Sequence, residues 1–219
     1  RQLNSICAGH PEYKKSTGIE TTTGPLGQGL ANAVGMAIAE EIFRKKFGSK
    51  IVNNRTYVIA SDGDLMEGIS HEAMSLAGHL KLRNLIVFFD NNKISIDGST
   101  SLSVSDNYKK RFESYGWNFT EINGHNENQI NSAIKKAKNS NKPSLISCKT
   151  VIGYGSPNKS GKSSSHGSPL GLDEIKLVRK TLNWKYKPFE IPNKILNEWK
   201  KIGKRGEKLE NTWSKIYKK

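Results

Sequence analysis

Short apolar runs that alternate with helix-like patterns constrain the fold of this chain more than any other feature. The β-rich runs stand at residues 56–60, 85–89, 119–122 and 144–152. Helix-like periods follow or separate them at residues 28–47, 67–82, 126–139 and 172–182. Apolar runs this short fit the buried strands of a parallel sheet. The alternation therefore predicts an α/β domain with a mainly parallel sheet and helices on both faces.

Length and composition set broad limits on the class of protein. A chain of 219 residues can hold one large domain, or one domain and a tail. The hydrophobic content of 35% fits a soluble globular protein, and no run approaches the ~20 apolar residues of a membrane helix. We expect no membrane span. Cys7 and Cys148 are too few for a disulfide framework, and reduced thiols fit a cytoplasmic protein.

The formal net charge of +15 raises the possibility of nucleic-acid binding. The basic residues are spread along predicted solvated helix faces, most densely in residues 173–219. Stacking aromatic residues are not interleaved with them in the pattern of a single-strand-binding groove. We therefore expect no nucleic-acid partner. A positive field favours anionic substrates such as sugar phosphates.

Oxygen-bearing side chains follow two of the predicted strands. Asp62 comes directly after the first run, and Asn92 ends the Asp-Asn-Asn string after the second. Ligand sites in parallel sheets form at the carboxyl ends of strands, so these two residues are expected to meet. A carboxylate, an amide oxygen and a backbone carbonyl suit Mg²⁺ or Ca²⁺. Alternatively, Asp62 is a helix cap and Asn91 with Asn92 forms a turn.

Two glycine-rich loops are further candidates for a binding site. Residues 24–29 open onto a helix, where a loop can cradle phosphate, although Gly-Pro can also be simple punctuation. Residues 153–169 are rich in Gly and Ser, a composition typical of a linker. They follow a strand end and contain His166, which favours a functional loop. The sequence begins with Arg1 and not with Met, which indicates a piece of a longer protein.

Longer strings of the sequence resemble the transketolase family. They are GHPE at residues 9–12, GIETTTGPLGQG at 18–29, DGDLMEGISHE at 62–72, DNNKISIDG at 90–98, IGYGSPNK at 152–159 and HGSPLG at 166–171. The resemblance covers essentially the whole chain. It implies a thiamine diphosphate-binding fold of the diphosphate-binding (PP) type over residues 1–182, truncated at its N-terminus. Residues 183–219 would form a helical exit segment toward an absent pyrimidine-binding domain.

The resemblance implies a role for each matching residue. The metal, Mg²⁺ or alternatively Ca²⁺ or Mn²⁺, would be held by Asp62, Asn92 and the carbonyl of Ile94. Thiamine diphosphate would be bound by Gly24, Pro25, Leu26, Gly63, Asn92, Ile96, Ile152 and His166. The implied catalytic residues are His10, His166 and Glu67. His10 and His166 would contact the donor sugar, and Glu67 would link two active sites across a dimer. We take His71, His79 and His125 to be bystanders.

The implied reaction is that of the pentose phosphate pathway enzyme, the reversible transfer of a two-carbon ketol unit. The donor would be a ketose phosphate such as xylulose 5-phosphate, and the acceptor an aldose phosphate. A homodimer would complete each site with the pyrimidine-binding domain of the second subunit, so this chain alone should be inactive. The alternatives are dihydroxyacetone synthase, deoxyxylulose phosphate synthase, or a non-catalytic cofactor-binding module. Ser61 and Ser163 depart from the family pattern, which has Gly and His there.

Overall fold

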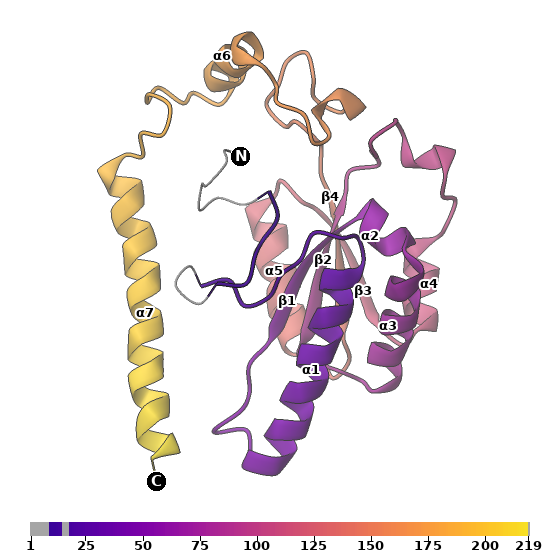
Figure 1. Ribbon diagram of the computed structural model, residues 1–219, viewed down its shortest axis with the longest axis vertical. Coiled ribbons are helices and arrows are strands. Elements are labelled where there is room, and N and C mark those ends of the chain that lie inside the picture. Colours follow the sequence, from indigo (N-terminus) through magenta and orange to yellow (C-terminus); the bar gives the residue numbers. More distant parts are fainter. Residues whose placement is uncertain (1–8, 15–17, 219) are drawn as a thin grey trace.

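A four-stranded sheet forms the centre of the protein (Figure 1). The computed structural model describes residues 9–14 and 18–218. The strands are β1 (Thr56–Ser61), β2 (Leu85–Asn91), β3 (Asn118–Asn123) and β4 (Ser144–Lys149). Their order is β1-β2-β4-β3, and every neighbouring pair is parallel. The predicted parallel sheet is confirmed, and β1 and β2 are direct neighbours.

Helices cover both faces of this sheet, as the sequence predicts (Figure 1). The larger core lies under α1 (Gln28–Phe47), α3 (Gly68–His79) and α4 (Tyr108–Ser114). The smaller core lies under α5 (Glu127–Lys138). Strand β2 contributes Val87 and Phe89 to the first core and Ile86 to the second. Because side chains alternate along a strand, an apolar run buried on both faces has no polar positions.

The helix predicted for residues 67–82 corresponds to α3, and a short helix that the sequence did not predict precedes it. α2 (Asp62–Met66) comes directly after β1, and α3 follows it. The Ser61 side chain accepts a hydrogen bond from the backbone N–H of Asp64, whose carboxylate accepts one from the backbone N–H of Ser61. This capping box starts α2 at Asp62. Glu67 then adopts an extended conformation, with φ −65° and ψ 140°, and separates the two helices.

Strand β4 ends at Lys149, three residues before the predicted end at residue 152. The backbone N–H of Val151 donates to Nε2 of His125 at 3.0 Å instead of to a neighbouring strand. The chain therefore leaves the sheet although its sequence stays apolar. Short helices that the sequence did not predict are α4, η2 (Thr100–Leu102) and η3 (Ser163–Ser165).

Two helices complete the chain, α6 (Leu172–Thr181) and α7 (Asn193–Tyr217). α7 lies beside the sheet domain (Figure 1), and Trp213 Nε1 donates to the Ile51 carbonyl at 2.9 Å. The division into a domain and an exit segment at residue 182 stays a prediction. None of the helices in the described ranges is long and apolar enough to span a membrane. Cys148 is a free thiol, and Cys7 lies outside the described residues.

Gly78 provides a test of how α3 packs against the turn that leads into β3. A Cβ atom at Gly78 would lie 1.8 Å from the carbonyl oxygen of Tyr115. Gly78→Ala should therefore destabilise the protein by about 2 kcal/mol, because the backbone must move to admit the methyl group. The matched control is Gly35→Ala in α1, where nothing lies within 4 Å. It should stabilise by roughly 0.5 kcal/mol through helix propensity. Urea unfolding of both variants measures the difference, and equal effects would contradict the packing described here.

Candidate functional site

The two predicted metal-binding side chains stand at the ends of neighbouring strands. Ser61 of β1 pairs in register with Asp90 of β2, so Asp62 and Asn92 follow adjacent strand ends. The side chain of Asn92 bridges its own loop, donating to Asp90 Oδ2 at 3.2 Å and accepting from the Ile94 N–H at 2.9 Å. An amide oxygen keeps a second lone pair after accepting one hydrogen bond. The turn that the sequence allowed is present, and it leaves Asn92 able to bind a cation.

Asp62 is a buried carboxylate that lacks a full set of partners. The residue is only 3% exposed. Oδ1 accepts from the Tyr108 hydroxyl at 3.4 Å, whereas Oδ2 has no hydrogen-bond partner in the part of the chain that the structure describes. Burial raises the pKa of Asp62, and the positive charge of Lys93 and the Tyr108 hydrogen bond oppose that rise. A buried, unpartnered carboxylate oxygen fits a ligand of a cation.

The chemistry of the donor set also fits a hard cation. In residues 9–14 and 18–218 there is no cluster of three or more His, Cys, Asp or Glu side chains that could hold a metal. The predicted set does not require one, because it contains one carboxylate, one amide and one carbonyl. Mg²⁺ commonly takes one or two carboxylates and fills its other positions with phosphate oxygens and water. Asp62 and Asn92 therefore fit a metal that is shared with a bound diphosphate.

The residues between these ligands hold the strand ends together. Asn91 is buried and donates to the Ser147 hydroxyl at 3.0 Å. The Thr150 hydroxyl donates to the Asp90 carboxylate. Lys93 has a left-handed backbone, with φ 64°, which is uncommon for a residue other than glycine. Strained backbone of this kind is found at functional sites. The loop after β2 is thus built by polar contacts to β4.

Asp64 joins the glycine-rich loop to the end of β1, a role that the sequence analysis missed. Its Oδ1 accepts from the Gly27 N–H at 3.1 Å, and its Oδ2 accepts from both the N–H and the hydroxyl of Ser61 at 2.8 Å. The available signal was the spacing of Ser61 and Asp64, which is that of a capping box. Ser61, which departs from the glycine of the family pattern, contributes this cap.

The loop of residues 24–29 brings several predicted site residues together. A Cβ atom at Gly24 would lie 2.6 Å from Cγ of His10, so the imidazole packs directly on this glycine. A Cβ atom at Gly63 would lie 3.2 Å from Cδ1 of Leu26. At Gly27, whose φ is 77°, it would lie 2.9 Å from Cβ of Glu67. The loop therefore contacts two catalytic candidates, His10 and Glu67, and also the Asp62-Gly63 turn.

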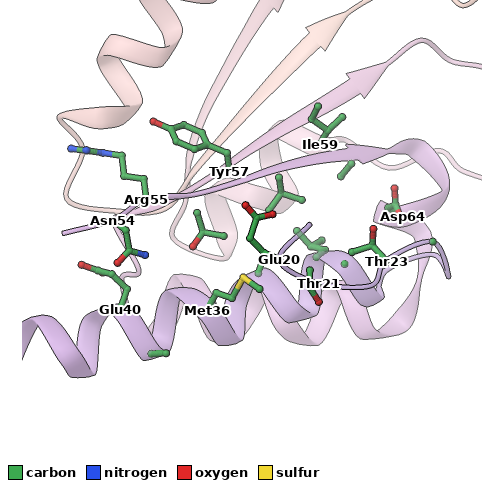
Figure 2. A pocket seen from close by; sticks show the side chains of 18 of the residues that line it. Glu20, Thr21, Thr23, Met36, Glu40, Asn54, Arg55, Tyr57, Ile59 and Asp64 are labelled. Carbon is green, nitrogen blue, oxygen red and sulfur yellow. The ribbon is translucent and has the colours of Figure 1, made fainter. Parts of the chain in front are cut away.

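A cavity of about 1010 Å³ opens beside this loop. Its wall includes Gly24, Pro25 and Leu26, together with residues of α1 and β1. In Figure 2 Asp64 lies beside Thr23 at one end of the cavity, and Arg55 and Glu40 lie at the other end. The cofactor-binding candidates of this loop therefore face open space rather than the packed core.

The second glycine-rich loop returns toward the end of β4. The Gly161 N–H donates to the Ile152 carbonyl at 2.8 Å, and the Ser165 hydroxyl donates to the Lys159 carbonyl at 2.6 Å. A Cβ atom at Gly153 would lie 2.8 Å from the Ser165 hydroxyl oxygen. His166 follows directly and is half-buried. The structure thus places His166 near the turn that carries Ile152, and the loop is not an extended linker.

The remaining candidates have less defined surroundings or unexpected partners. Ile96 is 73% exposed on the turn between Ser95 and Gly98. None of the contacts described above joins it to the other candidates. Two histidines interpreted as bystanders have structural contacts. His71 Nδ1 lies 3.0 Å from the Tyr115 hydroxyl, and His125 accepts from Val151 and stacks on Tyr154. His79 is exposed at the end of α3.

Comparison with known proteins identifies the family. The family described as "Transketolase, thiamine diphosphate binding domain" matches residues 1–219. The chain belongs to the transketolase family. It is 56% identical to a transketolase of Buchnera aphidicola over 99% of this chain and 33% of that protein. It is 50% identical to a transketolase of Sinorhizobium medicae over 97% of this chain and 31% of that protein. The predicted family and its thiamine diphosphate-binding domain are confirmed.

Solved transketolase structures share the fold described above. The transketolase of Campylobacter jejuni superimposes with a TM-score of 0.92 and 41% identity, over 98% of this chain and 34% of that chain. The transketolase of Leishmania mexicana gives a TM-score of 0.94 and 39% identity, over 98% and 33% respectively. The chain therefore spans about a third of the length of the relatives it matches.

The unpartnered oxygen of Asp62 leads to a prediction for the cation-free domain. Asp62→Asn preserves the shape of the side chain and removes a buried charge, so it should raise the urea midpoint when divalent cations are removed by EDTA. The same variant should lose the stabilisation that Mg²⁺ with thiamine diphosphate gives the parent protein. Asp97→Asn, at an exposed position, is the control and should change neither value. A less stable cation-free Asp62→Asn variant would argue against a ligand role.

Proposed function

We propose that this chain is the diphosphate- and metal-binding part of a transketolase. The complete enzyme transfers a two-carbon ketol unit from a ketose phosphate, such as xylulose 5-phosphate, to an aldose phosphate. The observation that carries the proposal is the buried, unpartnered Asp62 oxygen at a strand end beside Asn92. In addition, residues 1–219 match the thiamine diphosphate-binding domain of the family.

The diphosphate and its metal would be held at the carboxyl ends of β1 and β2. Asp62, Asn92 and the carbonyl of Ile94 would bind Mg²⁺, or alternatively Ca²⁺ or Mn²⁺. Gly63 has no side chain to obstruct the approach of phosphate oxygens to the backbone. The N-terminus of α1 lies directly after the glycine-rich loop and carries no acidic residue in its first turn. Its partial positive charge favours a nearby anion.

The rest of the cofactor would lie against apolar and glycine residues of the two loops. Gly24, Pro25, Leu26, Ile96 and Ile152 would line it. Thiamine diphosphate supplies a nucleophilic carbon and an electron sink when bound. The protein's contribution on this side is to fix the diphosphate and to exclude water from the reacting end of the cofactor.

Two imidazoles would orient the donor sugar and stabilise charge on its oxygens. His10 packs on Gly24 at the glycine-rich loop, and His166 follows the loop after β4. An imidazole can donate a hydrogen bond to a sugar oxygen and can exchange a proton near neutral pH. The overall charge of +15 would favour the approach of sugar phosphates.

A second subunit would complete each site, and the protein would act as a homodimer. The pyrimidine-binding domain would lie outside these 219 residues, which span about a third of the relatives' length. Glu67 is exposed next to Gly27, a position from which it could reach a partner subunit. We place the enzyme in the cytoplasm.

Dihydroxyacetone synthase and deoxyxylulose phosphate synthase share this architecture, and assays with different acceptors separate them from transketolase.

The two histidines give a test of the proposed donor site. In the complete enzyme, His10→Ala and His166→Ala should each lower turnover by roughly 10- to 10⁴-fold, the range for a lost proton-transfer or charge-stabilising group. Both changes should alter the thermal midpoint little, because His10 is exposed and His166 is only half-buried. His79→Ala serves as the control and should leave turnover unchanged. Steady-state kinetics with xylulose 5-phosphate and ribose 5-phosphate measure the effect. Similar losses in all three variants would refute the assignment.

The 219-residue chain by itself tests whether the site needs a second domain. Without the pyrimidine-binding wall, apolar cofactor surface stays in water, and its burial is worth a few kcal/mol at ~25 cal/mol per Å². Thiamine diphosphate affinity should therefore fall by about two orders of magnitude relative to the complete enzyme. We expect no ketol transfer by residues 1–219 alone. Calorimetry and the two-sugar assay provide the measurement, and turnover by the isolated chain would overturn the proposed division of the site.

A further inference from the structure

Glu174 in the first turn of α6 is a buried carboxylate that the proposed site does not use. It is 8% exposed and accepts three hydrogen bonds from the loop that follows β4. The Ser156 hydroxyl and the Asn158 N–H donate to Oε1, and the Asn158 side-chain amide donates to Oε2 at 2.9 Å. Charge-assisted hydrogen bonds of this kind are stronger than neutral ones.

These hydrogen bonds also keep Glu174 ionised. The Ser156 hydroxyl, followed by the side chain and the backbone of Asn158, holds the pKa of Glu174 at about 2. A carboxylate whose pKa is depressed on folding stabilises the fold at pH values above its ordinary pKa. That contribution disappears only as the pH falls toward about 2. The contact is therefore intact throughout the pH range in which the enzyme would be assayed.

The hydrogen-bonded network continues from Glu174 to the turn that carries His166. Ser156 also accepts from the Lys159 N–H at 3.1 Å, and Lys159 Nζ donates to the Leu170 carbonyl at 2.9 Å. The Lys159 carbonyl accepts from the Ser165 hydroxyl at 2.6 Å, one residue before His166. Three side chains thus connect α6 to the backbone on both sides of His166.

Apolar and ring packing supports the start of this loop, where Leu182 packs on Gly155 and Tyr154 stacks on His125, but not its continuation toward His166. Between residues 153 and 171, Ser156 is the one buried residue. A loop without a buried apolar side chain depends on its polar contacts for a single conformation. Glu174 supplies the charged centre of those contacts.

We infer that Glu174 is a positioning residue that holds the loop of residues 156–166 so that His166 faces the donor sugar. The inference rests on the role proposed above for His166. Glu174 does not itself touch the substrate. Its loss should allow the loop to sample other conformations, and the binding-competent fraction should fall accordingly.

Helix stabilisation is the competing explanation, because acidic residues in a first turn interact favourably with the helix dipole. Asp173 provides the matched control for that effect. It occupies the same turn of α6, is exposed, and pairs with Lys176 at 2.8 Å. A dipole effect would be similar at the two positions, whereas a positioning effect would be confined to Glu174.

The first experiment compares Glu174→Ala, Glu174→Gln and Asp173→Ala in the complete enzyme. Hydrogen exchange of peptides covering residues 156–166 should become faster in Glu174→Ala. KM for the ketose phosphate should rise about 10-fold in this variant, with a smaller change in kcat, because a tenth of the molecules would hold the loop correctly. Glu174→Gln should lie between it and the parent protein, since its amide oxygen can still accept two of the three hydrogen bonds. Asp173→Ala should match the parent protein.

A double-mutant cycle with His166→Ala separates positioning from a general loss of stability. If Glu174 acts through His166, the double variant should be within about twofold of His166→Ala alone. Multiplicative losses would overturn the inference, as would unchanged hydrogen exchange in Glu174→Ala. If Glu174→Ala does not fold, Asn158→Ala removes one donor from the exposed side of the network and should show the same pattern more weakly. A silent His166→Ala variant would refute the proposed function of that residue, while the exchange data would still decide whether Glu174 holds the loop.

Discussion

The carboxylate of Asp64 is the contact on which the geometry of the candidate site depends. It accepts hydrogen bonds from Gly27 in one loop and from Ser61 at the end of β1. The same contacts start α2 and thereby set the direction of Asp62 as the chain leaves the sheet. Its backbone carbonyl also accepts from the Ser70 hydroxyl in α3. Through its side chain and its backbone carbonyl, Asp64 thus joins the glycine-rich loop, a strand end and two helices. The candidate metal ligand lies at the centre of this junction.

Much of the fold follows from local sequence pattern, whereas the exceptions follow from contacts that are distant along the chain. The strands could be predicted because apolar runs buried on both faces, such as β2, are continuous and short. The short helix α2 was missed because it depends on a side-chain cap and not on apolar periodicity. The end of β4 was misplaced because His125 withdraws Val151 from the ladder. The sequence near Val151 carries no sign of that contact.

The candidate site, like the fold, contains residues that the sequence predicts and residues that it does not. Adjacent parallel strands place Asp62 and Asn92 together, so their proximity could be argued from spacing and sheet geometry alone. The assignment of His10 and His166 required the family strings, because a histidine in a loop has no local signature. Neither the strand spacing nor the family resemblance led to the roles of Asp64 and Glu174. Each acts through hydrogen bonds to a segment that is distant in sequence, 37 residues for Asp64 and 16 to 18 for Glu174. Contacts of that range are visible only in the folded chain.

The strand order has a consequence for how the domain assembles. Within the described residues, β3 pairs only with β4, although β4 is synthesised after it and lies between β3 and β2. β3 can therefore join the sheet only after β4 has been synthesised, whereas β1 and β2 can pair as soon as both have emerged from the ribosome. Such non-local pairing slows folding, because a long loop is closed before its contacts form. The strand ends that carry Asp62 and Asn92 can thus come together early in synthesis. The half of the site that follows β4, with Ile152 and His166, is completed last.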